Sequence, residues 1–157
     1  MHKLLAALVL IVASLPALAA AQATNTTRLA PGVVALMPDD LRWQPVPLVT
    51  DGRERAVLLG NPESGGDWVY RVRVPKPILV QPHTHPVDEL ITVLEGRWSF
   101  GLGTVFDTSK LVAYPPGRIV RIPANTPHFV ATRDEPVVIQ SSGSGVFATV
   151  PAQQSGD

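Results

Sequence analysis

The sequence predicts an all-β protein, a single-domain jelly-roll β-barrel. Its 16 prolines and 12 glycines divide the chain into short runs that are rich in β-branched and aromatic residues. Beyond the apolar N-terminal run, the one helical pattern is a weak one over residues 53–59. Many short strands separated by turns at this spacing indicate a sandwich or a barrel of the jelly-roll type.

The first residues predict a secretory leader. Residues 4–20 carry no charged side chain, and they follow Lys3. Ser14 and Pro16 interrupt this run, which is shorter than the roughly 20 apolar residues that a membrane-spanning helix needs. We expect a signal peptide over residues 1–23 and a periplasmic or secreted protein; the alternative is a retained membrane anchor. Cleavage suits the small residues Ala19, Ala21 or Ala23.

Two segments follow the leader. The first, residues 24–60, is expected to be an extended N-terminal arm that can add an edge strand to the sheet. Its prolines prevent a long helix; they are Pro31, Pro38, Pro45 and Pro47. The second, residues 61–152, is expected to form the barrel. The length that remains after cleavage suits one domain and one core.

Charge and cysteine content exclude several classes of function. The chain has 13 Lys and Arg residues against 13 Asp and Glu residues, which leaves no basic surface of the kind that binds nucleic acid. It has no cysteine, so it can form neither a disulfide nor a thiolate metal site. We expect no nucleic acid and, once the leader is removed, no membrane as partner. A homodimer is among the oligomeric states left open.

Eight strands are expected in the barrel, and turns rich in Pro, Gly, Ser and Asn separate them. In chain order they cover Trp68–Val74, Leu90–Leu94, Arg97–Leu102, Val112–Tyr114, Ile119–Ile122, His128–Thr132, Val137–Gln140 and Val146–Val150.

The histidines are the candidate metal ligands. Of the four in the chain, His2 belongs to the leader, which leaves His83, His85 and His128. His83 and His85 are two residues apart, so strand alternation points both side chains to one face. Glu89 follows after a turn that can send its carboxylate back to the pair. Three imidazoles and a carboxylate suit a first-row divalent ion, although a histidine near a strand end can also be a hydrogen-bonded side chain without metal.

The spacing of these residues resembles the cupin superfamily. The first cupin motif runs Gly, five residues, His-x-His, three or four residues, Glu, six residues, Gly; the matching residues here are His83, His85, Glu89 and Gly96. The second runs Gly, five residues, Pro-x-Gly, two residues, His, three residues, Asn; the matching residues are Gly117, Pro123 and His128. The stretch from Gln81 to Phe129 is similar to small single-domain bacterial cupins described as ChrR-like. The resemblance implies that His83, His85, Glu89 and His128 are the metal ligands.

Three positions depart from the motifs. Pro77 replaces the first glycine, Asn125 the turn glycine of the second motif, and Thr132 its final asparagine. After glycine, asparagine is the residue that best tolerates a positive φ, so we expect the turn before His128 to be kept. The other two departures concern loop and strand geometry and leave the ligands in place.

The residues around the metal are expected to come from alternating strands. Trp98 and Phe100 share one strand face and should line the interior. Tyr70 and Val72 share one face of an earlier strand, and Arg71 and Arg73 share the other. An inward arginine could clamp a carboxylate substrate, but an outward pair is the preferred interpretation. Gln140, in a late apolar strand, could donate or accept a hydrogen bond in the pocket.

The resemblance and the ligand set imply two functions of different kinds. The first is a metal-dependent enzyme that acts on a small organic molecule, an oxygenase first and an isomerase or lyase next, with one ion of Zn, Cu, Fe, Mn or Ni. Four protein ligands leave open positions on a six-coordinate ion, and Glu89 could also leave the metal and act as a catalytic base. The alternative is a non-enzymatic module that binds a small molecule or merely the metal.

Overall fold

The computed structural model describes residues 32–153, so the predicted leader lies outside the described residues. The chain divides into two units, residues 1–34 and 35–157, and every strand within residues 32–153 belongs to the second unit. This boundary falls inside the segment 24–60 that we expected to form an arm. Within the described residues, no helix is of a length and hydropathy that would let it cross a membrane.

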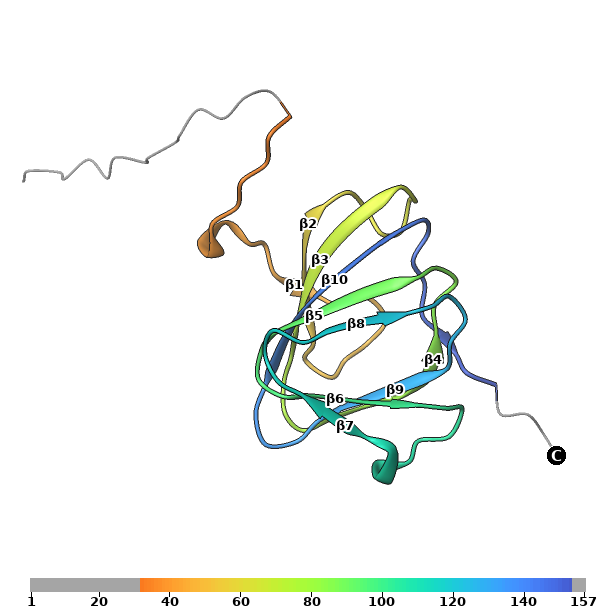
Figure 1. Cartoon of the computed structure of the whole chain (residues 1–157). Helices are drawn as coiled ribbons and strands as arrows, with labels where there is room; N and C mark the ends of the chain where they lie inside the picture. Colours follow the sequence, from red (N-terminus) through yellow and green to blue (C-terminus); the bar gives the residue numbers. More distant parts are fainter. Residues whose placement is uncertain (1–31, 154–157) are drawn as a thin grey trace, which may run out of the picture. The chain divides into compact units, whose positions relative to one another are not determined.

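The strands form two antiparallel sheets, which Figure 1 shows one above the other. Sheet A has the order β1-β2-β3-β10-β5-β8. Its strands are β1 (Gln44–Pro45), β2 (Glu54–Leu59), β3 (Asp67–Val74), β10 (Val137–Ser144), β5 (Glu89–Glu95) and β8 (Ile119–Ile122). Sheet B has the order β11-β4-β9-β6-β7. Its strands are β11 (Val150–Pro151), β4 (Ile78–Thr84), β9 (His128–Thr132), β6 (Trp98–Leu102) and β7 (Val112–Tyr114).

The all-β jelly-roll prediction is confirmed, although in residues 32–153 the two sheets stay separate instead of closing into one continuous barrel. Regular helix is limited there to two short 3₁₀ turns, η1 (Pro38–Asp40) and η2 (Thr108–Lys110). The core lies between the sheets, because alternate side chains of each strand point inward. Its buried members from the two sheets are Val74, Ile91, Val93, Ile122, Val137, Ile139, Trp98 and Phe100.

Two expected elements are different in the structure. The helix suggested by the weak pattern over residues 53–59 is wrong, because residues 54–59 form β2, the second strand of sheet A. Its burial alternates: Ala56 is fully buried and Val57 is exposed. The strand expected over Val146–Val150 is reduced to β11, which begins only at Val150.

Two further strand segments were not expected. Strand β4 was not predicted because prolines lie near both of its ends. Pro82 is at the position where the pairing of β4 with β9 shifts register, between Val80 and His83. Proline donates no backbone hydrogen bond, so it is tolerated at such an irregularity. Strand β10 continues past Gln140 to Ser144, because Ser141 and Ser142 pair with both β3 and β5 and the two residues after them pair with β3.

Candidate metal centre

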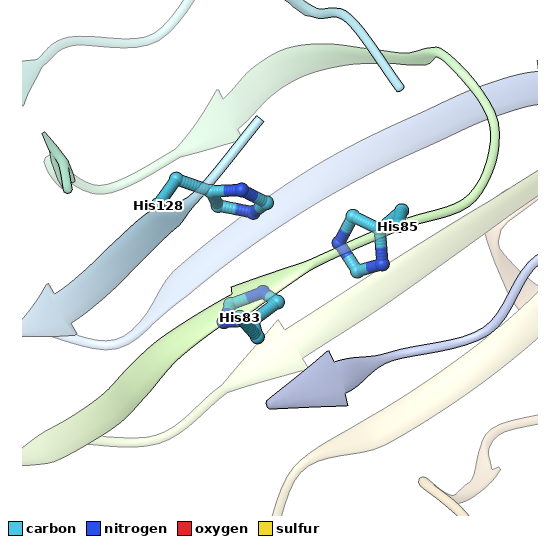
Figure 2. Close-up of side chains that lie close together, drawn as sticks. All are labelled: His83, His85 and His128. Carbon is cyan, nitrogen blue, oxygen red and sulfur yellow. The ribbon is translucent and has the colours of Figure 1, made fainter. Parts of the chain in front are cut away.

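Three histidines from sheet B meet between the sheets. His83 lies in β4, His85 follows directly after that strand, and His128 is the first residue of β9. His83 and His128 are direct partners across the β4–β9 pair. Figure 2 shows the three imidazoles arranged around one common space. One nitrogen of each ring can be chosen so that all three lie within 4.8 Å of one another.

Each ring is held by a hydrogen bond at Nδ1. The acceptors are the backbone carbonyls of Gln81 for His83 (2.7 Å), Ala148 for His85 (2.8 Å) and Thr126 for His128 (2.9 Å). A carbonyl can only accept, so Nδ1 carries the proton in every ring and Nε2 keeps its lone pair. Backbone anchoring of this kind orients histidines that bind metal. All three Nε2 atoms are therefore available as ligands.

Burial keeps the three rings neutral. It lowers the pKa of His83 to about 3, with a contribution from neighbouring His128. Burial also lowers the pKa of His85 and of His128. A metal ion needs neutral imidazole, so no proton has to leave these rings at neutral pH before an ion can bind.

Glu89 approaches the histidines from the opposite sheet. It is the first residue of β5 and is buried, with Oε2 3.4 Å from Nε2 of His85. Its other oxygen, Oε1, accepts hydrogen bonds from the hydroxyl groups of Ser141 (2.5 Å) and Tyr70 (3.3 Å). One oxygen is thus held within sheet A while the other faces the imidazoles. Burial raises the pKa of Glu89, and the hydrogen bond from Ser141 opposes that shift.

Tyr70 and Ser141 are functional neighbours that the sequence did not identify. They are direct cross-strand partners on β3 and β10. Burial and the adjacent Glu89 raise the pKa of Tyr70 well above its ordinary value, so its phenol stays protonated and donates. The alternation of Ser141 with the buried Val137 and Ile139 was the one signal that could have placed its side chain inward.

The histidines and Glu89 lie on the wall of a cavity of about 480 Å³. Apolar side chains from both sheets form much of the wall, and they include Val72, Ile91, Trp98, Val130 and Ile139. The interior position expected for Trp98 and Phe100 is observed, since both are buried and the Phe100 ring lies 5.6 Å from that of His128. A ligand in this cavity would contact the histidine cluster directly.

The preferred interpretation of Arg71 and Arg73 agrees with the structure, because neither lines this cavity. Arg71 donates through Nε to Oε1 of its cross-strand partner Gln140 at 3.1 Å. This hydrogen bond occupies the side-chain amide that we considered as a partner for a ligand in the pocket. The guanidinium of Arg73 lies 3.8 Å from the ring centroid of Trp43. Two other arginines, Arg53 and Arg55, line the cavity instead.

Two of the motif departures have structural roles. Asn125 has a φ of 59°, so it adopts the left-handed turn in which glycine was expected. Its backbone N–H donates to the carbonyl of His85 at 2.7 Å and ties the two histidine segments together. Thr132 donates through Oγ1 to the carbonyl of Pro75 at 2.5 Å and accepts from the N–H of Ile78 at 3.0 Å. These bonds hold the far end of the β4–β9 pair.

The donor set fits a divalent metal ion. Three neutral nitrogens and a carboxylate oxygen match the preferences of zinc, copper, nickel and iron, and the carboxylate also admits manganese. The structure brings His83, His85 and His128 together as one group, and it places Glu89 beside His85. The ligand role of all four residues stays a prediction.

Comparisons with known proteins agree with this architecture. The family described as ChrR Cupin-like domain matches residues 21–132. No curated protein matches the chain.

Several solved structures share the fold. The polyketide cyclase RemF from Streptomyces resistomycificus has a TM-score of 0.65 and 19% identity, and the match covers 80% of this chain and 89% of that one. KdgF from Halomonas sp. has a TM-score of 0.53 and 21% identity, with coverage of 69% and 92%. The DMSP lyase DddQ from Ruegeria pomeroyi has a TM-score of 0.58 and 22% identity, with coverage of 76% and 64%. Identities this low establish a common fold only.

Proposed function

Because the chain belongs to the ChrR cupin-like family, we propose that it is a metal-dependent enzyme whose divalent ion is bound by His83, His85 and His128. The observation that carries the proposal is the common orientation of the three rings. Each Nδ1 donates to a backbone carbonyl, which leaves three neutral Nε2 atoms in one buried space. Such an arrangement lowers the cost of binding an ion, because the ligands are already deprotonated and oriented.

Glu89 is the proposed fourth ligand, through Oε2. Its Oε1 is held by Ser141 and Tyr70, so the carboxylate can offer one oxygen without losing its place in sheet A. With one negative charge from Glu89 and none from the imidazoles, the ligand set suits Zn, Cu, Fe, Mn or Ni. When bound, the ion would supply Lewis-acid polarisation of a substrate oxygen or activation of a small molecule.

The cavity favours catalysis over a closed structural site. The histidines and Glu89 all lie on its wall, so one side of the centre faces space that a small organic molecule can enter. We propose an oxygenase first, and an isomerase or lyase next. The fold houses a polyketide cyclase and a DMSP lyase in other proteins, which supports reaction chemistry without specifying it.

Glu89 has a second proposed role as a base. A carboxylate that leaves the metal could take a proton from substrate through Oε2, because Oε2 is the oxygen on the side of the histidines. Burial raises the pKa of Glu89, which makes this carboxylate a stronger base than an exposed one. Ser141 and Tyr70 would keep Oε1 fixed while the proton moves.

A non-enzymatic module is the second candidate. Anchoring of all three rings by backbone carbonyls is also what a purely structural metal site requires. The two candidates differ in whether the ion keeps a position for water or substrate.

Export is a further part of the proposal. The uncharged run over residues 4–20 and the small residues that follow it support removal of residues 1–23 by a signal peptidase. N-terminal mass analysis of the protein from the periplasm tests this part. A mature chain that begins between residues 20 and 24 would support export, and an intact Met1 in soluble periplasmic protein would contradict it.

Water access to the ion tests the enzymatic proposal. The protein is loaded with Mn²⁺ or Cu²⁺, and the relaxation of water protons is measured. An open coordination position exchanges water and speeds relaxation well beyond that of the same ion in a fully coordinating chelator. Relaxation no faster than in the chelator would show a closed centre and would favour the structural module.

A further inference from the structure

Two arginines bring positive charge into the cavity. Arg55 lies in β2 and Arg53 directly precedes that strand, so alternation gives both side chains the same face of sheet A. Both line the cavity that the histidines line, and their side chains are only 19% and 18% exposed for Arg53 and Arg55. In the part of the chain that the structure describes, the other charged residues on this wall are Glu63 and the buried Glu89.

The two arginines differ in the number of hydrogen bonds that they make to a carboxylate. Nε of Arg53 donates to both carboxylate oxygens of Asp51, at 3.0 and 2.9 Å, and the backbone N–H of Arg53 donates to the same side chain. Arg55 has one such bond, from Nη2 to Oε1 of Glu63 at 2.6 Å. The side chain of Glu63 is 53% exposed. Arg53 is therefore fixed, whereas Arg55 can exchange an exposed carboxylate for another one at little cost.

Arg55 also lies near the metal centre. Its Cζ atom is 5.6 Å from the ring centroid of Tyr70, and the hydroxyl of that tyrosine donates to Glu89. One tyrosine ring thus separates the guanidinium from the proposed ligand Glu89. Apolar side chains form much of the rest of the cavity wall, and Val72, Ile91 and Ile139 are among them.

Charge balance indicates what the cavity would accept. Asp51 neutralises Arg53, and Glu63 neutralises Arg55. A divalent ion bound by three neutral imidazoles and Glu89 would leave one positive charge in a largely apolar space. One negative charge on a ligand would bring the summed charge of the ion, Glu89, the two arginines and their carboxylate neighbours to zero, and a guanidinium binds a carboxylate through two parallel hydrogen bonds.

We propose that the cavity binds a small organic monocarboxylate with an apolar body, whose carboxylate replaces Glu63 on Arg55 while the body packs against the valines and isoleucines beside the histidines. This inference rests on the proposed metal centre and names the class of its substrate. It also gives Glu63 a role at the rim of the cavity: its carboxylate competes with the ligand for Arg55.

Calorimetric titration of the metal-loaded protein tests the proposal, with benzoate as the probe and benzamide as its neutral counterpart. Benzoate should bind roughly tenfold more tightly or better, because charged hydrogen bonds are stronger than neutral ones. Arg55→Gln should abolish this preference. Glu63→Gln should strengthen benzoate binding severalfold, because it removes the competing carboxylate. Arg73→Gln is the matched control, since Arg73 lies outside the cavity, and it should change nothing.

Several results would overturn the proposal. Equal affinity for benzoate and benzamide, or no binding of either, would exclude a carboxylate site. A benzoate preference that survives Arg55→Gln would place the carboxylate on the metal ion instead of the arginine. Glu63→Gln is an exposed substitution that leaves the core intact, so unchanged affinity in this variant would count against competition at Arg55. Metal content measured in the same samples separates failure of this inference from failure of the metal centre.

Discussion

His83 and His128 are direct cross-strand partners in β4 and β9, with ring centroids 4.2 Å apart. The register shift between Val80 and His83 is what brings the two histidines opposite each other. The Thr132 hydroxyl holds the other end of the same strand pair through Pro75 and Ile78. The geometry of the proposed metal centre therefore depends on the backbone pairing of sheet B as much as on the imidazoles.

Loss of a proposed ligand should weaken metal binding far more than loss of a nearby carboxylate. His128→Ala removes a buried nitrogen, and we expect its affinity for zinc to fall by more than about 100-fold. Glu95→Ala is the control, because Glu95 is exposed at the end of β5. Titration against a competing chelator gives both constants, and equal affinities in the two variants would refute the ligand assignment.

Neighbouring serines on β10 should differ in effect. Ser141→Ala removes the hydroxyl that donates to Glu89, so we expect metal affinity to fall by about 10-fold to 100-fold. The Ser142 hydroxyl donates to the carbonyl of Leu90, at 3.4 Å, instead of to Glu89, so Ser142→Ala should leave affinity unchanged. The same chelator titration decides the question. Similar constants for the two variants would mean that the bond from Ser141 to Glu89 does not support the centre.

The histidine cluster could be predicted from the sequence because short sequence patterns identify its members. His83 and His85 share a face by strand alternation, and the motif spacing added His128 and Glu89. Ser141 could not be predicted in the same way, since Ser141-Ser142-Gly143-Ser144 has the composition of a turn. It is part of a strand because β10 pairs on both sides, with β3 and β5.

Arg55 was missed for a related reason. The apolar residues that follow it, Ala56 to Leu59, have a spacing compatible with a helix, and helical and extended patterns are hard to separate in so short a segment. Pairing with β3 selects the extended form and turns Arg55 toward the cavity. The two expected arginines, Arg71 and Arg73, lie on β3 itself but outside this cavity.

Two glycines with similar backbone angles should respond differently to alanine. Gly96 has a φ of 70°, and an added Cβ would lie 2.3 Å from the carbonyl oxygen of Pro136. Gly117 has a φ of 86°, but an added Cβ would meet no atom within 4 Å. We expect Gly117→Ala to lower the free energy of unfolding by about 1–2 kcal/mol, the cost of the left-handed angle alone. Gly96→Ala should cost clearly more in urea denaturation, and equal losses would contradict the close contact.

The metal-free protein should lose stability in weak acid. The pKa of His83 is about 3 in the folded protein and close to its ordinary 6.5 when unfolded. Between these values the unfolded chain binds a proton that the folded one does not, so stability falls as pH falls below 6.5. From about pH 8 to about pH 5, the wild type should lose about 2 kcal/mol more than His83→Asn. Urea denaturation with chelator present measures both, and parallel pH curves would show that His83 is not buried neutral.

The most direct test of the central claim is elemental analysis of the purified protein after incubation with zinc, manganese, iron and copper in turn. The wild type should retain close to one divalent ion per chain after gel filtration, with at least one of these metals. The variant with His83, His85 and His128 all replaced by alanine should retain none. A wild-type protein that stays metal-free under every condition, or a triple variant that keeps the ion, would contradict the account.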